Sequence, residues 1–391
     1  MKIESSDRLS FVEEYYFSRK LREIRTRKAA GEEIFNLGIG SPDLPPHPEV
    51  IQTLARVAAE PEAHHYQSYA GLPELREAYS HYYFSQYQVD LNPKDEILSL
   101  IGSKEGIMHL SMAVLNSEDQ VLVPNPGYGS YASCARLAGA EPVYYRLEEK
   151  NGWCIDLDAL KTMDTSKVKI LWVNYPHMPT GTVPSFKHLE DLVSFAQERN
   201  ILICNDNPYS TILTETPLSI LQVDGAKGTA CELNSLSKSH NMAGWRVGML
   251  GGSAKLIQTV LKFKSNMDSG KFKAIQMAAV TALHLDNTWY ESLNDTYRSR
   301  QEIGIKMLRM LGCKVNKPDA GMFLWARIPS GYKDGISYSE YLLDTFGIFI
   351  PPGSIFGDVG QNYIRMSLCT SGQVISNITS KIEERLRAHA R

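Results

Sequence analysis

The chain has 391 residues, which is long enough for two or three domains of ordinary size and a sizeable buried core. Hydrophobic residues make up 43% and charged residues 22% of it, values near the globular average that argue against a disordered or low-complexity protein. The formal net charge is −3, from 41 basic and 44 acidic residues without a long run of one sign. The charge therefore indicates no nucleic-acid or anionic-membrane partner.

The spacing of the cysteines bears on metal binding, and the composition of the N-terminus bears on cellular location. The six cysteines are scattered, and neither Cys-x-x-Cys nor a His pair at metal-ligand spacing occurs, so we expect reduced thiols and no metal site. The first 27 residues mix acidic and basic side chains and lack the apolar core of a signal peptide. No stretch approaches the roughly 18 apolar residues that span a bilayer. We expect a cytoplasmic protein without a membrane partner.

The N-terminal segment, residues 1–45, is expected to join or cover a small domain. It contains a charged helical stretch, Glu13–Ala30, followed by the Gly- and Pro-rich segment Asn36–Asp43.

From about residue 95, β-rich runs alternate with helical stretches, which is typical of βαβ units and a mainly parallel sheet. Residues 46–290 are therefore expected to form a large α/β domain with a seven-stranded sheet flanked by helices. The expected strands are Ile97–Ile101, Gln120–Val123, Pro142–Arg146, Val168–Asn174, Ile201–Asn205, Ala230–Ser235 and Val247–Gly251. The expected helices between them are Glu105–Asn116, Tyr128–Leu137, Phe186–Arg199 and Ala254–Phe263.

After a long helical region around Trp289–Leu311, the pattern changes to that of a smaller α+β domain, residues 291–391. We expect strands at Met322–Arg327 and Tyr363–Leu368, a helix near Tyr338–Thr345 and a terminal helix from Val374.

The strongest chemical signal is a lysine directly after the strand that ends at Ser235. The stretch reads Ser235-Leu-Ser-Lys-Ser-His-Asn-Met-Ala-Gly-Trp-Arg-Val-Gly248, so Lys238 lies among small and apolar residues. A buried lysine loses proton affinity, and its neutral amine can form a Schiff base with a carbonyl. The hydroxyls of Ser235 and Ser237 and the guanidinium of Arg246 suit a phosphate.

This segment resembles the cofactor-lysine motif of the class I/II aminotransferases, which are fold type I enzymes that use pyridoxal 5'-phosphate. Further stretches in the same order carry the resemblance from Asn36 to Leu368. The segment Ser265–Gly270, with Gln276 downstream, is similar to the branch of alanine-, aspartate- and LL-diaminopimelate-type aminotransferases. The resemblance implies a Lys238 Schiff base with pyridoxal phosphate.

The stretch Asp206-Asn-Pro-Tyr209 follows an apolar strand, whose carboxyl end faces the ligand crevice of an open α/β sheet. By resemblance, Asp206 pairs with the pyridine nitrogen and Tyr209 donates to the phenolic oxygen. A carboxylate keeps that nitrogen protonated, so the ring can accept electrons from the substrate Cα. Without the resemblance, the stretch also fits an ordinary capped loop.

Three further stretches match cofactor contacts of the family. Gly102-Ser103-Lys104 opens a helix, and the free N–H groups of such a turn bind anions, so the resemblance makes it the phosphate cradle. Tyr128, at another strand-to-helix turn, would stack on the cofactor ring. Tyr66 matches a tyrosine that reaches the phosphate of the neighbouring subunit, which implies a homodimer with shared active sites.

Two residues match substrate contacts. Arg365, in Tyr363-Ile-Arg-Met-Ser367, corresponds to the arginine that binds the substrate α-carboxylate, and Gly40 would bring backbone close to the same group. Judged from the residues alone, Arg365 could equally face water on an edge strand.

The chain departs from the family at one position. Members commonly carry Asn-Pro-Thr-Gly, and the asparagine binds the phenolic oxygen of the cofactor. Here the stretch reads Asn174-Tyr-Pro-His-Met-Pro-Thr-Gly181, with Met178 in place of the asparagine. Since a thioether cannot donate a hydrogen bond, that oxygen must depend on Tyr209, a water, His177 or Asn174.

The sequence thus predicts an aminotransferase that moves an amino group between an L-amino acid and a 2-oxo acid. Two alternatives stay open: a pyridoxal-phosphate-dependent carbon–sulfur β-lyase, and a non-catalytic regulator that binds the cofactor. Tyr15 or Tyr16 either closes over the site or packs its helix, and we favour packing. The amino donor and acceptor are not specified.

Overall fold

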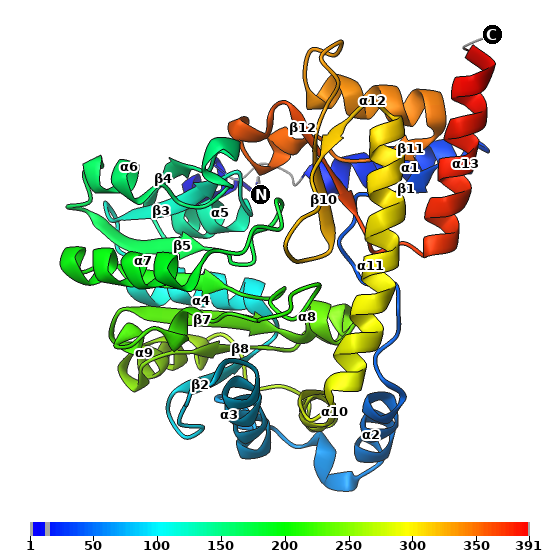
Figure 1. The fold of residues 1–391 in the computed structure, drawn as a ribbon. Coiled ribbons are helices and arrows are strands. Elements are labelled where there is room, and N and C mark those ends of the chain that lie inside the picture. The colour runs from blue at the N-terminus through cyan, green and yellow to red at the C-terminus, as the bar shows by residue number, and fades with distance from the viewer. Residues whose placement is uncertain (1–2, 12–15, 390–391) are drawn as a thin grey trace.

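The computed structural model describes residues 3–11 and 16–389, and it forms a large sheet-based body and a smaller one, bridged by one long helix (Figure 1). Tyr15 and the expected start of the first helix at Glu13 lie outside the described residues. The rest of that helix is α1, Tyr16–Ala29. Among the helices of the described part, none is long and apolar enough to cross a membrane.

The large body contains a seven-stranded sheet in the order β2-β8-β7-β6-β5-β3-β4. All seven expected strands are present, and within this sheet β8 pairs antiparallel with β2 and β7, whereas the other described pairings are parallel. The sheet is therefore mainly parallel, as expected. Its strands are β2 Ile97–Leu100, β3 Gln120–Asn125, β4 Glu141–Arg146, β5 Val168–Val173, β6 Leu202–Asp206, β7 Ala230–Ser235 and β8 Gly248–Gly251.

Helices cover both faces of this sheet, which explains its apolar central strands. In β5, Leu171 and Val173 belong to one buried cluster, whereas Ile170 and Trp172 belong to another. The second cluster includes residues of α4 Ser103–Val114, α5 Ser130–Leu137 and α9 Ala254–Lys264. The first includes residues of α2 Pro48–Ala58, α3 Pro73–Tyr87, α6 Leu157–Thr162, α7 Phe186–Arg199 and α10 Lys273–Leu283.

Four of these helices, α2, α3, α6 and α10, are absent from the sequence expectations. The helix α3 shows why, because Tyr79, Tyr82, Tyr83 and Tyr87 are all buried in it. The buried residues of α3 lie on one face of the helix, but most of them are tyrosines, which are only weakly apolar, so the 3.6-residue hydrophobic pattern is weak in the sequence.

The smaller body packs an antiparallel sheet, β12-β10-β9, against helices. A separate parallel pair, β1 with β11, attaches the N-terminal segment. The strands are β1 Phe35–Asn36, β9 Lys314–Val315, β10 Phe323–Arg327, β11 Ile348–Phe349 and β12 Tyr363–Ser367. The helices are α12 Gly335–Phe346 and α13 Gly372–His389.

The helix α11, Asn287–Met310, connects the two bodies (Figure 1). Tyr290, near its start, belongs to the core of the large body, whereas Met307 and Leu308 belong to the core of the small one. The expected domain boundary at residues 290 and 291 falls inside this helix, and the division of the chain into three parts stays a prediction.

Candidate active site

A cavity of about 430 Å³ lies between residues of both bodies and the N-terminal segment. Thirteen of the residues singled out from the sequence line it, although they are far apart along the chain. They are Gly40, Ser103, Lys104, Tyr128, Asn174, Met178, Asp206, Tyr209, Ser235, Ser237, Lys238, Arg246 and Arg365. The convergence follows from the topology, because the carboxyl ends of parallel strands meet at one edge of the sheet.

Lys238 lies on the one-turn helix α8, Leu236–Ser239, directly after β7. Its Nζ donates to the backbone oxygen of Gly40 over 2.5 Å. Burial, together with the nearby positive charges of Arg365 and Arg246, lowers the pKa of Lys238. A lowered pKa increases the fraction of Lys238 that is present as the neutral, nucleophilic amine.

Asp206 ends β6 and is buried, with 5% of its surface exposed. Its Oδ2 accepts a hydrogen bond of 3.0 Å from the hydroxyl of Tyr131, whereas Oδ1 is buried with no hydrogen-bond partner among the described residues. Burial raises the pKa of Asp206 to about 6, and the nearby hydroxyls of Tyr131 and Ser103 oppose that rise. A buried, half-satisfied carboxylate suits a protonated ring nitrogen.

The start of α4 forms a cradle with Arg246. Gly102 has a φ of +96°, and a Cβ at this position would lie 2.4 Å from Nη2 of Arg246. No side chain at Gly102 caps the first turn of α4, so its N–H groups remain for an anion. Arg246 also donates to Ser237 Oγ over 3.5 Å, and Ser237 Oγ lies 2.9 Å from Ser235 Oγ. Hydroxyls, a guanidinium and a helix N-terminus therefore surround one small space.

Arg365 lies on β12, an edge strand of the smaller sheet, but its side chain is buried and does not face water. Its guanidinium carbon lies 4.1 Å from the ring centre of Phe323 and 4.6 Å from that of Phe356. Its Nη2 donates to the backbone oxygen of Gly38 over 2.6 Å, and its Nη1 lies 3.3 Å from Sδ of Met178. Flanking rings of this kind restrict a guanidinium to one plane and favour its charge.

Met178 is buried beside Asn174, whose amide nitrogen and oxygen each make a hydrogen bond to the backbone. Asn174 Nδ2 donates to the backbone oxygen of Asp206 over 2.5 Å, and its Oδ1 accepts from the N–H of Met178 over 2.8 Å. His177 does not line the cavity, because its ring nitrogens lie 2.8 Å from Thr180 Oγ1 and 3.1 Å from the oxygen of Pro126. Of the side chains considered as substitutes for asparagine, Tyr209 remains the clearest donor to the cavity.

Two residues named from the sequence lie elsewhere. Tyr66 is 92% exposed and does not line the cavity of its own chain. Tyr16 packs edge-on against Phe17, with ring centres 6.0 Å apart, and is likewise absent from the lining. Tyr16 thus contributes to the packing of α1 in this structure, and its expected packing role stays a prediction.

Sequence reasoning missed several lining residues, among them Phe17, Leu21, Ile39, Tyr131, Phe323 and Phe356. Tyr131 stacks on Trp172 with ring centres 4.9 Å apart. It lies only three residues from Tyr128, and nothing in the local sequence distinguishes the tyrosine that reaches Asp206. The phenylalanines are ordinary core residues by pattern, and only the packing places them beside Arg365.

The cavity combines a buried lysine of lowered pKa, a buried and half-satisfied aspartate, and a cradle of hydroxyls, a guanidinium and a helix N-terminus. This combination is the one expected of an enzyme with a phosphate-bearing carbonyl cofactor. The family model for class I and II aminotransferases matches residues 32–382. The chain is 39% identical to LL-diaminopimelate aminotransferase of Dehalococcoides mccartyi over 96% of its length and 97% of the relative's. It is 38% identical to the LL-diaminopimelate aminotransferase of Aquifex aeolicus, covering 97% and 98%. Apo-BacF from Bacillus subtilis superposes with a TM-score of 0.94 at 33% identity, covering 98% of each chain.

The chain belongs to the class I and II aminotransferase family. It is a pyridoxal-phosphate-dependent aminotransferase of fold type I, as the sequence predicted, and it acts on amino acids and 2-oxo acids. The carbon–sulfur β-lyase alternative is not favoured by these relatives.

The residues present fit pyridoxal phosphate. Oδ1 of Asp206 is a buried acceptor without a partner among the described residues, as a pyridinium nitrogen requires. The absence of a side chain at Gly102 keeps the approach to Arg246 and the α4 N-terminus open for a phosphate. The pKa of Lys238 is lowered by burial, as a lysine that attacks a carbonyl requires.

Proposed function

We propose that Lys238, Asp206 and Arg365 perform the amino transfer in this cavity. One observation carries the proposal: Lys238 and Arg365 bind the same short N-terminal stretch, at the backbone oxygens of Gly40 and Gly38 respectively. The amine-reactive lysine and the carboxylate-binding arginine therefore lie at one short stretch of the cavity lining. One α-amino acid in this cavity can present its amino group toward Lys238 and its carboxylate toward Arg365.

The cofactor is held by three sets of groups in this proposal. Asp206 binds the ring nitrogen and keeps it protonated, with Tyr131 holding the carboxylate in position. Ser235, Ser237, Arg246 and the Gly102–Lys104 turn bind the phosphate. Tyr128 stacks on the ring and Tyr209 donates to its phenolic oxygen. Bound pyridoxal phosphate supplies the carbonyl that receives the amino group and the ring that withdraws electrons from the substrate Cα.

The substrate is oriented by Arg365 and deprotonated by Lys238. The guanidinium of Arg365 binds the α-carboxylate as a fork, and Phe323 and Phe356 keep that fork in place. Nζ of Lys238 removes the proton from Cα of the amino acid in one half-reaction. In the other half-reaction it returns a proton to the corresponding carbon of the former 2-oxo acid. The fixed carboxylate determines which Cα bond faces Lys238.

We propose further that two copies of the chain share their active sites. Tyr66 supports this, because it is 92% exposed although it matches a phosphate-binding tyrosine. The exposed residues Tyr69, Met267 and Phe272 add apolar surface. The segments that carry them are in contact, since a Cβ at Gly270 would lie 2.7 Å from the oxygens of Gln67 and Ser68. In the dimer, Tyr66 of one copy would bind the phosphate in the other.

The decisive experiment follows the visible absorbance of the cofactor-loaded enzyme. An L-amino acid should bleach the visible band, and a 2-oxo acid should restore it. A panel of donors should include LL-diaminopimelate, which the names of the curated relatives suggest. Lys238→Ala should abolish bleaching, whereas Lys255→Ala, on the exposed side of α9, should behave as wild type. Accumulation of ammonia without a 2-oxo acid requirement would instead indicate a lyase.

Shared sites can be tested by mixing two inactive variants, Tyr66→Ala and Lys238→Ala. A dimer with one subunit of each kind has one site without either change, so mixing should restore up to about a quarter of the activity. No recovery after verified subunit exchange would contradict shared sites.

A further inference from the structure

A fully buried glutamate, Glu232 on β7, lies behind the candidate active site and does not line its cavity. It was not singled out from the sequence, and no role proposed above uses it. Glutamate side chains are almost never fully buried unless their charge is paired. The partners of Glu232 therefore indicate what it does.

Four hydrogen bonds hold the carboxylate of Glu232. Its Oε1 accepts from the hydroxyl of Tyr83 over 2.9 Å and from Nδ2 of Asn207 over 3.2 Å. Its Oε2 accepts from Nδ2 of Asn205 over 2.8 Å and from the N–H of Ile220 over 3.1 Å. An ionised carboxylate has room for about four donors, whereas a protonated one would itself donate. The four donors thus favour the ionised form.

The charge of Glu232 is held by neutral groups. Among the described residues, no basic side chain forms an ion pair with it. Burial raises the pKa of Glu232, and the hydrogen bonds from Asn205 and Tyr83 oppose that rise. This part of the core therefore carries a negative charge without a positive partner.

Glu232 binds the residues on both sides of Asp206. The strands β6 and β7 are parallel neighbours, and Asn205 is the partner of Glu232 across them. Successive side chains of a strand point to opposite faces. Asp206 accordingly lines the cavity, whereas Asn205 and Asn207 do not. Glu232 thus holds the two asparagines from behind, while the carboxylate between them faces the cavity.

Both asparagines have a second anchor. Oδ1 of Asn205 accepts from the N–H of Tyr175 over 3.0 Å. Nδ2 of Asn207 also donates to the backbone oxygen of Leu218 over 3.0 Å. A connected network of this kind holds its members in one arrangement. The end of β6 is therefore fixed before any ligand binds.

The charge of Glu232 also reaches Asp206. Burial raises the pKa of Asp206, and the negative charge of Glu232 adds to that rise. The hydroxyls of Tyr131 and Ser103 and the positive charge of Lys238 act in the opposite direction. The other titratable groups nearby are tyrosines of raised pKa, which are neutral at pH 7. They are Tyr128, Tyr131 and Tyr209 around Asp206, and Tyr82, Tyr83 and Tyr87 around Glu232.

We infer that Glu232 is a positioning residue for Asp206: it fixes the strand end that carries this carboxylate, and its negative charge strengthens the attraction of that end for a protonated ring nitrogen. The inference rests on the proposed function, in which Asp206 binds that nitrogen, and it adds a residue to the function. A charge in the protein interior acts over a longer range than one in water, because the effective dielectric constant is lower.

The test is a titration of the apoenzyme with pyridoxal phosphate, followed by visible absorbance from pH 5 to pH 8. Glu232→Gln keeps the size of the side chain and removes its charge. The affinity should be roughly three- to tenfold weaker than that of wild type at pH 8, because one negative charge near the ring nitrogen is lost.

The expected difference disappears in acid. Removing a like charge lowers the pKa of Asp206, so the acid midpoint of the affinity profile should move to lower pH. At pH 5 the affinities should agree within about twofold, because the variant loses less affinity to protonation of Asp206. An equal loss at every pH would indicate general damage to the fold and would overturn the inference, as would a profile identical to that of wild type.

Two further variants show whether the position of the charge matters. Glu141→Gln removes the same charge from the exposed start of β4 in the same sheet, and it should leave the profile unchanged. The exchange Glu232→Gln with Asn205→Asp moves the carboxylate to the neighbouring strand. It should restore the affinity at pH 8 to within about twofold of wild type. A folded exchange variant as weak as Glu232→Gln would contradict a role for the charge.

Circular dichroism verifies that each variant folds, and one measurement needs no variant. Carbon NMR of wild-type protein labelled at the side-chain carboxyl of glutamate should show every glutamate ionised at pH 8. A glutamate that is still protonated at this pH would overturn the inference, because the charge of Glu232 is its premise.

Failure of the inference and failure of the proposed function are distinguishable through Asp206→Asn. If Asp206→Asn weakens the affinity at pH 8 by about tenfold or more while Glu232→Gln has the wild-type profile, the inference fails and the proposed function stands. If Asp206→Asn leaves the affinity unchanged, Asp206 does not bind the ring nitrogen, and both fail.

Discussion

Replacing Tyr131 by phenylalanine removes the hydroxyl that donates to Oδ2 of Asp206 over 3.0 Å. The ring can keep its stacking on Trp172, so the change is confined to one hydrogen bond. A hydrogen bond to a charged group contributes about 1.5–3 kcal/mol, which corresponds to roughly 1–2 pH units. Because that bond stabilises the ionised carboxylate, its loss should raise the pKa of Asp206 from about 6 to roughly 7–8.

The consequence is a pH-dependent loss of cofactor binding. Only ionised Asp206 can pair with a protonated ring nitrogen, so affinity should fall as the pH drops through its pKa. At pH 7 the ionised fraction falls from about nine-tenths to between about one-tenth and one-half. The affinity of the Tyr131→Phe apoenzyme for pyridoxal phosphate should therefore be about two- to tenfold weaker at pH 7 and equal to wild type above pH 9.

The assay is a titration of apoenzyme with pyridoxal phosphate between pH 5.5 and 9.5, followed by visible absorbance. Tyr145→Phe is the matched control, because Tyr145 is also a buried tyrosine and donates to the backbone oxygen of Trp172 over 2.8 Å. It should leave the pH profile unchanged. A Tyr131→Phe profile that superposes on wild type, or that is lowered equally at every pH, would refute the reasoning.

Three further predictions concern the cradle, the carboxylate site and the unusual methionine. Gly102→Ala should weaken the affinity for the cofactor by about tenfold or more, because the new Cβ would lie 2.4 Å from Arg246 and the φ of Gly102 is +96°. The control Gly129→Ala should leave the affinity unchanged, because a Cβ at Gly129 would have no atom within 4 Å. Arg365→Lys should lower kcat/KM for L-alanine by roughly 10–100-fold with unchanged cofactor content, as measured by steady-state kinetics, because an ammonium cannot replace the bidentate fork. Met178→Asn should shift the pH midpoint of the holoenzyme's visible absorbance titration, and an unchanged midpoint would show that the amide at this position has no electronic effect.

Much of the site can be predicted from the sequence, because its residues occupy turns directly after strands. Gly102–Lys104 follows β2, Asp206 ends β6 and Lys238 follows β7. Such turns carry local signals, namely a Gly before a helix, an Asp after an apolar run and a Lys among hydroxyls. Since the carboxyl ends of parallel strands converge, predicting the strands also predicts that these residues meet.

Other parts of the site have no local signal. Tyr128 and Tyr131 lie three residues apart on one turn, yet Tyr131 is the one bonded to Asp206. Which ring reaches the carboxylate depends on how α5 packs across β5 and Trp172. The sequence also does not predict that β8 runs antiparallel to its neighbours, because an apolar strand pattern is the same in either direction.

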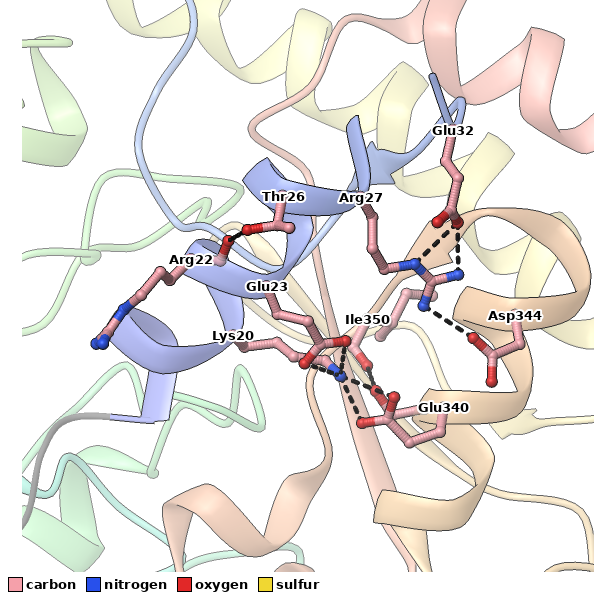
Figure 2. A network of polar contacts seen from close by, with 10 residues as sticks. Lys20, Arg22, Glu23, Thr26, Arg27, Glu32, Glu340, Asp344 and Ile350 are labelled. Atoms are coloured by element: carbon pink, nitrogen blue, oxygen red, sulfur yellow. Dashed lines mark hydrogen bonds and ion pairs between the residues drawn. The ribbon is translucent and has the colours of Figure 1, made fainter. Parts of the chain in front are cut away.

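The sequence by itself determined the α/β architecture, the seven strands of the large sheet and the lysine, aspartate and arginine of the family motifs. These depend on periodicity and on short motifs, which are properties of neighbouring residues. The tertiary structure alone decided that Phe17, Leu21 and Ile39 line the same cavity, and that Phe323 and Phe356 enclose Arg365. Those contacts join residues up to hundreds of positions apart, and they depend on tertiary packing: β10 pairs with β12 beside Arg365, and ion pairs and apolar packing hold α1 against the smaller body (Figure 2).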